Sequence, residues 1–413
     1  DYQLTYPLVL VAAAMLGAAF PLISHAAIGP ERQAGQGVGL LYLSNIAGSA
    51  LGSFLVGFVV MDYLSLKAVS VLLLGLGFAL AMVLLRLAHP EGARTTALGG
   101  AVVCCILAAG SGPLFAHFYE RLFYESTYRK GTTFKEIVEN RNGVISVDHA
   151  ETVYGGGVYD GHFNIDPATD TNGVFRCYAI AGLHPDPKRV LIIGLSSGSW
   201  AQILAHMPGV QDVTIVEINP GYLPLIAERP HVASLLHNPH VHIVIDDGRR
   251  WLVSHPDARF DFILMNTTLN WRAHASNLLS VEFMQMLRSH MLPGGVAYYN
   301  TTSSGEVQRT GATVFADALR VANFLAVSDS PIIYDRARVR TVLASMQIDG
   351  EPVYDLSDPR YRAALERTAN LPVVAGEDPS KPVSYSIEGR ASLLARLKDK
   401  RLVTDDNMGT EWQ

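Results

Sequence analysis

The chain has 413 residues, of which 49% are hydrophobic and only 17% are charged. This length exceeds a typical domain of about 100 to 200 residues, and the mean hydropathy of +0.20 lies on the apolar side of ordinary soluble chains, so we expect two or three units with a lipid-facing part. The formal net charge of -6 excludes a broad basic surface, so nucleic acid is not an expected partner.

Four apolar stretches with almost no charge occupy the N-terminal third of the chain. Each approaches or exceeds the roughly 18 to 20 residues that a helix needs to cross the hydrocarbon core of a membrane. The stretches are apolar on all sides, whereas helices buried in a soluble bundle normally keep one polar face. We therefore predict a transmembrane bundle of four helices over residues 1–122. Their apolar parts are Pro7–Ile23, Gln33–Met61, Ala68–Leu85 and Thr95–Tyr119.

The orientation of this bundle does not follow from the loop charges, because basic residues are nearly balanced on the two sides. An even number of spans puts both ends of the chain on one side, and a domain that uses a cytosolic nucleoside cofactor must face the cytoplasm. We therefore expect an integral protein of a bacterial-type inner membrane, with its C-terminal region in the cytoplasm. The chain begins almost directly on a span, so we also expect part of the membrane domain to lie upstream of this sequence.

Short β-type runs follow in residues 123–188. They alternate in polarity and are separated by three glycines at 155–157 and by Asp160-Gly161, which predicts a small antiparallel hairpin unit. The runs are Gly143–Val147, Thr152–Val158 and His162–Ile165.

Strand and helix patterns alternate regularly over residues 189–350. Repeated units of this kind predict a parallel sheet with helices on both faces, which is an α/β Rossmann-like fold. Residues 351–413 are polar and are expected to form one or two helices and a loose end. The predicted strands are Val190–Ile193, Val213–Val216, Val241–Ile245, Phe260–Met265 and Val296–Asn300, and Leu292–Gly295 is expected to be a turn before the last of them.

A glycine-containing loop, Gly194–Ser199, connects the first of these strands to a helix. Glycine lets the backbone come close to a ligand, and a helix N-terminus offers unpaired N–H groups, so Gly194, Ser196, Ser197 and Gly198 are predicted to contact a cofactor. Glu217 ends the second strand about 20 residues later, where an acid can hold both hydroxyls of a ribose. NAD is the second choice, because the third glycine of its usual motif is missing and only Ala201 is small enough nearby.

Two acidic residues, Asp246 and Asp247, follow the third strand. A carboxylate at this place can accept a hydrogen bond from an adenine amino group. Three loops then converge at the carboxyl edge of the sheet, the usual ligand site of such folds. The alternative is that Glu217 only caps a helix and Asp247 only turns the chain.

The fourth strand ends in residues that are predicted to meet the reacting substrate. Asn266 can donate or accept at the reacting end of the cofactor, and His274 is a candidate general base. Trp271 can attract a sulfonium through its ring face, and Arg272 is expected beside the substrate. The structural alternatives are that Asn266 caps a loop and that Trp271 is a core or membrane-interface residue. Arg272 would then pair with a nearby acid, and His274 would be a hydrogen-bonded loop histidine.

From Glu139 to Met346 the sequence resembles the spermidine synthase (polyamine aminopropyltransferase) family, specifically its membrane-fused members. The stretch His184–Gly194 is similar to the family's entry into its glycine loop, and Glu217 and Asp247 stand where the family holds ribose and adenine. The resemblance implies that an amine attacks the carbon next to the sulfonium of decarboxylated S-adenosylmethionine and releases methylthioadenosine.

The sequence departs from this family where the polyamine should bind. The family has an acid at the position of Ser197, and an Asp-Ser-Ser-Asp pattern where this chain has residues 266–269, Asn-Thr-Thr-Leu. A neutral side chain cannot compensate a desolvated ammonium as a carboxylate does. The family's Tyr-His-Glu stretch also has no counterpart near Asn172–Tyr178.

The leading hypothesis is a membrane-anchored transferase that moves an aminopropyl or other alkyl group from S-adenosylmethionine or its decarboxylated form to an amine-type acceptor. A methyltransferase and a non-catalytic nucleoside-binding or assembly subunit of a membrane complex remain open. The expected partners are the lipid bilayer and a small-molecule acceptor, while a homo-oligomer or a membrane-complex partner stays open. The three cysteines show no metal-ligand spacing, so no metal site is expected.

Overall fold

The computed structural model describes residues 2–27, 34–88, 93–266, 275–375 and 385–407. The chain divides into two compact units. One comprises Asp1–Phe115 with Glu139–Arg141, and the other comprises Ala116–Val138 with Asn142–Gln413.

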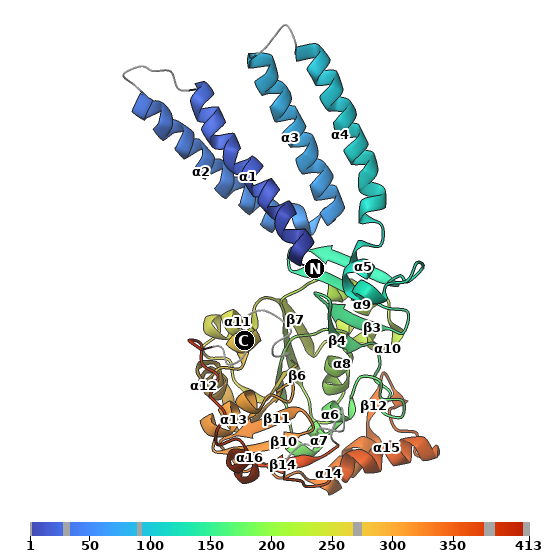
Figure 1. The fold of residues 1–413 in the computed structure, drawn as a ribbon. Helices are drawn as coiled ribbons and strands as arrows, with labels where there is room; N and C mark the ends of the chain where they lie inside the picture. The colour runs from blue at the N-terminus through green and yellow to red at the C-terminus, as the bar shows by residue number, and fades with distance from the viewer. Residues whose placement is uncertain (1, 28–33, 89–92, 267–274, 376–384, 408–413) are drawn as a thin grey trace. The chain divides into compact units, whose positions relative to one another are not determined.

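Four long helices make up the first unit (Figure 1). Three segments are long and apolar enough to cross a membrane, at Gly35–Asp62, Leu66–Leu84 and Thr95–Phe115. Many of their large apolar side chains are exposed; Leu98, for example, is 70% exposed. A fourth span, over the first helix, stays a prediction. The helices are α1 (Tyr2–Ala27), α2 (Ala34–Phe58), α3 (Leu66–Ala88) and α4 (Ala93–Phe115).

A four-stranded sheet forms the predicted hairpin unit, with the strands in chain order. The turn between its last two strands contains Gly156 and Gly157, both with positive φ, as a tight hairpin requires. Two details of the prediction were wrong: Asp160-Gly161 lies inside a strand, and no strand covers residues 163–165. The strands are β1 (Glu136–Asn140), β2 (Gly143–Val147), β3 (Thr152–Gly155) and β4 (Val158–His162), and α5 (Phe118–Tyr124) precedes them.

Asp160 sits at a β-bulge, which explains why it does not break the strand. Val153 pairs with Gly161 and Tyr154 pairs with Tyr159, so Asp160 has no partner across the strand pair. A bulge of this kind bends the strand and redirects a side chain, often next to a functional site. Gly161 is needed for close packing, because a Cβ there would lie 2.8 Å from Oγ of Ser196.

The central sheet has eight strands in the order β14-β10-β11-β9-β8-β5-β6-β7. The five predicted strands are confirmed and pair in parallel, and the chain order reverses between β5 and β8. Parallel sheets bind ligands at such a switch point, beyond the carboxyl ends of the strands. The parallel strands are β5 (Arg189–Ile193), β6 (Asp212–Glu217), β7 (Val241–Ile245), β8 (Phe260–Met265) and β9 (Met291–Asn300). The others are β10 (Asp317–Val321), β11 (Phe324–Ser328) and β14 (Ile387–Gly389), while β12 (Gln347–Ile348) and β13 (Glu351–Pro352) form a separate pair.

Helices cover both faces of this sheet, and alternate residues of its strands feed two hydrophobic cores. In β5, Val190 and Ile192 join one core, whereas Leu191 and Ile193 join the other. One core packs against α6 (Phe175–Tyr178), α7 (Ile180–Leu183), α8 (Ser199–Ala205), α9 (Tyr222–Ala227), α10 (Pro230–Ala233), α14 (Arg336–Ser345) and α15 (Pro359–Ala369). The other packs against α11 (Gly248–Ser254), α12 (Val281–Ser289), α13 (Gly305–Val314) and α16 (Arg390–Arg396).

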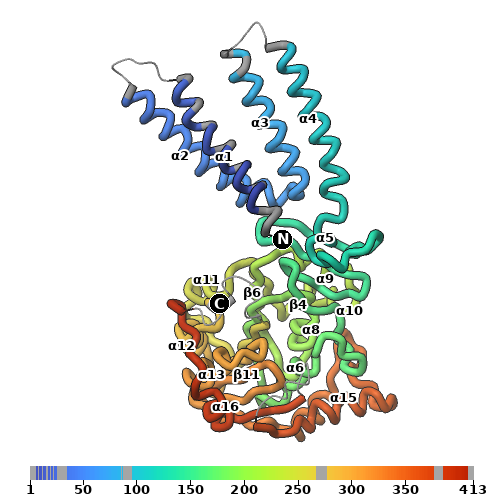
Figure 2. Tube along the Cα trace, in the orientation of Figure 1, coloured from blue at the N-terminus to red at the C-terminus, as the bar shows by residue number. Residues whose placement is uncertain are grey.

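The C-terminal region adds a strand that the sequence did not predict. β14 joins the edge of the sheet beside β10, and α16 packs next to α13 in the trace of Figure 2. Arg320 of β10 and Glu388 of β14 are both fully buried and form an ion pair at 3.0 Å. Ser392 and Arg396 also donate to the Glu388 carboxylate, so the buried charge is compensated on several sides.

The predicted turn at Leu292–Gly295 also differs from the structure, because these residues lie inside β9. They form an irregular stretch between two pairings with β8, in which Phe260 pairs with Met291 and Phe262 with Val296. Gly294 has a φ of 81°, which suits glycine and explains why the sequence resembled a turn.

Candidate functional site

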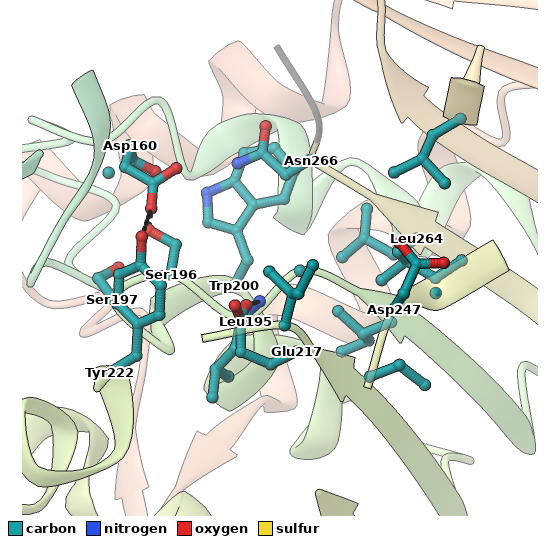
Figure 3. A pocket seen from close by; sticks show the side chains of 18 of the residues that line it. Asp160, Leu195, Ser196, Ser197, Trp200, Glu217, Tyr222, Asp247, Leu264 and Asn266 are labelled. Carbon is teal, nitrogen blue, oxygen red and sulfur yellow. Dashed lines mark hydrogen bonds between the residues drawn. The ribbon is translucent and has the colours of Figure 1, made fainter. Parts of the chain in front are cut away.

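A cavity of about 450 Å³ opens at the carboxyl edge of the sheet, at the switch point between β5 and β8 (Figure 3). Six of the seven residues predicted to bind a cofactor line it, together with Asn266. Figure 3 shows Asp160 and Tyr222 at one side, Asp247 at the opposite side and Glu217 between them. The cofactor residues in the lining are Gly194, Ser196, Ser197, Glu217, Asp246 and Asp247.

The glycine loop after β5 has the backbone that its sequence suggests. Gly194 has a φ of 91° and its N–H donates to the Val216 carbonyl at 2.9 Å, which ties the loop to β6. Ser196 has a φ of 50°, and its hydroxyl donates to the Asp160 carbonyl at 2.8 Å. Gly198 does not line the cavity; it is the N-cap residue of α8 and has a φ of 75°.

Glu217 is the acid at the end of β6, and it is 4% exposed. Its Oε2 accepts from the Leu195 N–H at 2.6 Å, and its Oε1 accepts from the Asn219 N–H at 2.7 Å. These bonds orient Glu217, which lines the cavity, and a carboxylate can accept hydrogen bonds from ligand hydroxyls. This arrangement suits a sugar diol at the floor of the cavity.

The two acids after β7 differ in their surroundings. Asp246 accepts from the Arg250 Nε at 2.6 Å and from the Asp247 N–H at 2.7 Å. Asp247 caps α11 through one oxygen, Oδ1, which accepts from the Arg250 N–H at 2.8 Å. Asp247 therefore has a structural role as the N-cap of α11, but this role uses only one of its two carboxylate oxygens.

Asp160 and Tyr222 are cavity residues that the sequence analysis missed. The Tyr222 hydroxyl donates to the Asp160 Oδ2, and Asp160 lines the side of the cavity away from Asp247. No sequence pattern indicated this position, since an Asp-Gly pair usually marks a turn and the bulge is a property of strand pairing. Asp160 thus provides a carboxylate in the part of the cavity near Ser197 and Asn266, where the sequence had suggested only neutral side chains.

A second cavity, of about 380 Å³, adjoins the first and shares Asp160, Asn172 and Asn266 with it. Its remaining lining comes from Tyr159 of β4, from the loop before α6, from α6 itself, from the end of β9 and the loop after it, from Asn323 just before β11, and from Tyr385. A molecule in this cavity would therefore lie next to one end of a ligand in the first cavity.

Asn266 lines both cavities, and its predicted role at the reacting end of the cofactor stays a prediction. Its Oδ1 accepts from the Asn300 Nδ2 at 3.1 Å, and the Asn300 Oδ1 accepts from the Asn323 Nδ2 at 2.9 Å. The amide orientation follows from this hydrogen-bond network. Asn266 therefore presents N–H donors to a ligand, and an amide in this state cannot act as a general base.

Trp271 and Arg272, predicted to lie beside the substrate, and His274, the candidate general base, fall outside the described residues, and their roles stay predictions. Tyr298 and Tyr299 of β9 are fully buried and line neither cavity. Burial raises the pKa of both phenols, so neither offers a proton at neutral pH.

The parallel part of the central sheet, with a glycine loop after β5 and a cavity at its switch point, defines the Rossmann-like class of α/β domains. Within that class, residues 180–318 match the spermine/spermidine synthase domain. The chain therefore contains a spermidine synthase-like domain and is a distant homologue of the polyamine aminopropyltransferases.

The polyamine aminopropyltransferase of Mycobacterium tuberculosis (strain CDC 1551 / Oshkosh) is 32% identical over 113 residues, which are 26% of this chain and 22% of that protein. Polyamine aminopropyltransferase 2 of Streptomyces coelicolor is 26% identical over 299 residues, or 68% of this chain and 52% of that protein. The chain thus spans between about a fifth and a half of these relatives. A crystal structure of spermidine synthase with the transition-state analogue AdoDATO superposes with a TM-score of 0.45 and 15% identity, over 56% of this chain and 88% of that chain.

Replacing Glu217 tests whether the first cavity binds a nucleoside. We expect Glu217→Ala to weaken methylthioadenosine binding by about 10- to 100-fold, because hydrogen bonds to a charged group contribute roughly 1.5–3 kcal/mol. Isothermal calorimetry on the detergent-purified chain measures this. Glu228→Ala, an exposed acid outside the lining, is the control and should bind as the wild type does. Unchanged affinity in Glu217→Ala would contradict the assignment of the cavity.

The pair between Arg249 and Asp405 predicts a pH-dependent stability. Arg249 lines the first cavity and donates to the two Asp405 oxygens at 2.8 and 2.5 Å. These hydrogen bonds lower the pKa of Asp405 below its ordinary value of 3.8. The stabilisation is therefore present above the unfolded-state pKa and is lost as the pH falls through the lower pKa of the folded protein.

We expect Asp405→Asn to lower the free energy of unfolding by about 1 kcal/mol at pH 7, because a partly exposed pair is screened by solvent. The difference from the wild type should shrink as the pH falls below 3.8. Urea titration followed by tryptophan fluorescence measures it, and all four tryptophans lie after residue 116, so the signal reports the second unit. The exposed Asp257→Asn is the control. A difference that persists unchanged at pH 3 would refute this account of Asp405.

Proposed function

We propose that the chain is a membrane-anchored transferase that moves the aminopropyl group of decarboxylated S-adenosylmethionine to an amine acceptor. The observation that carries this proposal is the pair of adjoining cavities, which meet at Asp160, Asn172 and Asn266. A two-substrate transfer needs such an arrangement, because both reactants must be held in contact and in line. The spermidine synthase-like domain supports the same reaction class.

The first cavity suits the nucleoside part of this substrate. Glu217 at its floor would accept from the ribose hydroxyls, and Asp247 at one side would accept from the adenine amino group. The sulfonium and its propyl chain would then point to the opposite side, where Asp160 and Asn266 line both cavities. The cavity volume of about 450 Å³ lies within the range of small-molecule sites.

The reaction itself requires an uncharged amine in line with the carbon–sulfur bond. The nitrogen lone pair forms a bond to the propyl carbon, the carbon–sulfur bond breaks, and its electron pair neutralises the sulfonium. Among the described residues, Asp160 is the carboxylate that lines both cavities, and it would hold the incoming ammonium and accept its proton. Tyr222, which donates to Asp160, would fix the direction of the carboxylate.

A second candidate is a nucleoside-binding subunit without turnover. It is favoured by Ser197 and Asn266, since neither side chain carries a charge and Asn266 presents donors to the cavity. Methyl transfer from intact S-adenosylmethionine is separated from aminopropyl transfer by its product, S-adenosylhomocysteine.

Membrane anchoring is also part of the proposal. The three apolar segments in the first unit support it, and the need for a cytosolic nucleoside would place the second unit in the cytoplasm. Cysteine labelling of the intact cell, with a single accessible cysteine introduced at the exposed position of Asp257, tests on which side of the membrane the second unit lies.

Incubating the purified chain with decarboxylated S-adenosylmethionine and a panel of amines should release methylthioadenosine, as followed by liquid chromatography. Asp160→Asn should lower the rate by about 10²- to 10⁴-fold, the usual contribution of a proton acceptor, with little change in nucleoside affinity. The exposed Asp257→Asn is the matched control. Tight nucleoside binding without methylthioadenosine from any amine would favour the second candidate instead.

A further inference from the structure

The second cavity contains one arginine, Arg176, that the proposed transfer reaction has not yet used. Its Nε donates to the Gly173 carbonyl at 2.9 Å, its Nη1 to the Asn323 Oδ1 at 2.7 Å and its Nη2 to the Asn172 carbonyl at 3.2 Å. All three acceptors are neutral. A guanidinium has five N–H groups, so two remain for a ligand.

No carboxylate of the described residues forms an ion pair with Arg176. Burial lowers the pKa of its guanidinium, yet arginine remains charged at neutral pH. Asp170 lies close enough for its charge to raise the pKa of Arg176, but it makes no direct ion pair with the guanidinium. A desolvated cation is costly, and an anionic group of a ligand that contacts it directly would offset this cost.

The position of Arg176 is fixed by its surroundings. The guanidinium lies over the rings of Trp200 and Phe324, at 5.2 and 5.1 Å from their centroids. Gly173 has a φ of 61°, and a Cβ there would come within 2.3 Å of the Arg176 Nη2. The backbone thus leaves room for the guanidinium, as expected for a side chain held in place for binding.

The other charged groups of the second cavity are two acids. Asp170 accepts from the Val174 N–H at 2.5 Å and from the Phe175 N–H at 3.3 Å, so both its oxygens face the backbone of α6. Burial raises the pKa of Asp170, while the charges of Arg176 and Arg367 act in the opposite direction, so this acid already interacts with two cations of the protein. Asp160 stands at the junction with the first cavity. An amine is therefore favoured at the junction, whereas a second ammonium further inside would meet Arg176.

We infer that the second cavity binds an acceptor whose amine is attached to a carboxylate, and that Arg176 pairs with this carboxylate. The inference rests on the proposed function and names its acceptor class, an ω-amino acid rather than a diamine or polyamine. The acceptor nitrogen bonds to the propyl carbon while the carbon–sulfur electron pair passes to sulfur, and the amine proton passes to Asp160. The products are an N-(3-aminopropyl) amino acid and methylthioadenosine.

Calorimetry on the purified full chain tests this directly, with and without saturating methylthioadenosine. The probes are 4-aminobutyrate, 5-aminopentanoate and 6-aminohexanoate, each compared with the diamine of equal length, 1,4-diaminobutane, 1,5-diaminopentane or 1,6-diaminohexane. We expect at least one amino acid to bind about 10-fold or more tightly than its diamine. Arg176→Gln should weaken that binding by about 30-fold, as the loss of a charge-assisted pair predicts.

The controls separate a binding role of Arg176 from a structural one. Arg362→Gln removes an exposed arginine that donates only to backbone carbonyls, and it should leave amino acid affinity unchanged. Arg176→Lys keeps the charge and should retain part of the affinity, and methylthioadenosine affinity should survive in both Arg176 variants. If Arg176→Gln does not fold, the relative affinities of the wild-type protein for the amino acid and the diamine still test the inferred acceptor class.

The inference is overturned if the diamines bind as well as the amino acids or better, if no amino acid binds, or if Arg176→Gln binds them as the wild type does. The proposed function fails in a different way. Amino acid binding that depends on Arg176, with no binding of methylthioadenosine, would keep the anion site and remove the transfer reaction.

Discussion

One buried carboxylate sets the geometry on which the candidate site depends. Glu217 ends β6 and accepts backbone N–H bonds from Leu195, in the loop after β5, and from Asn219, in the loop after β6. A buried carboxylate needs such donors, because desolvation without them is costly. The same two bonds therefore satisfy the charge, fix the two loops against each other and form the floor of the first cavity.

The rest of the second unit builds on this floor. The bulge in β4 directs Asp160 to one side of the cavity, and Asp247 at the start of α11 stands on the other. The C-terminal region contributes through Asp405, which holds Arg249, and through β14, which extends the sheet by a buried ion pair. A region that reads as a polar tail thus supports both the sheet and the cavity lining.

The sequence predicted those features that depend on local pattern. Alternating strand and helix patterns predicted all five parallel strands, and the spacing between Gly194 and Glu217 predicted that both face one cavity. Features that depend on pairing between distant segments were missed. Neither the bulge at Asp160 nor the three-residue strand β14 has a pattern of its own, and Arg176 gains its significance from the neutral acceptors that hold its guanidinium in the cavity.

The central claim is that a nucleoside lies across Glu217, with its purine at Asp247 and its reacting end at Asp160. A cryo-electron microscopy structure of the full chain with methylthioadenosine tests it most directly. The account predicts density in which both ribose hydroxyls contact the Glu217 carboxylate and the methylthio group points to Asn266. A nucleoside bound elsewhere, or bound in this cavity with its sugar away from Glu217, would contradict the account.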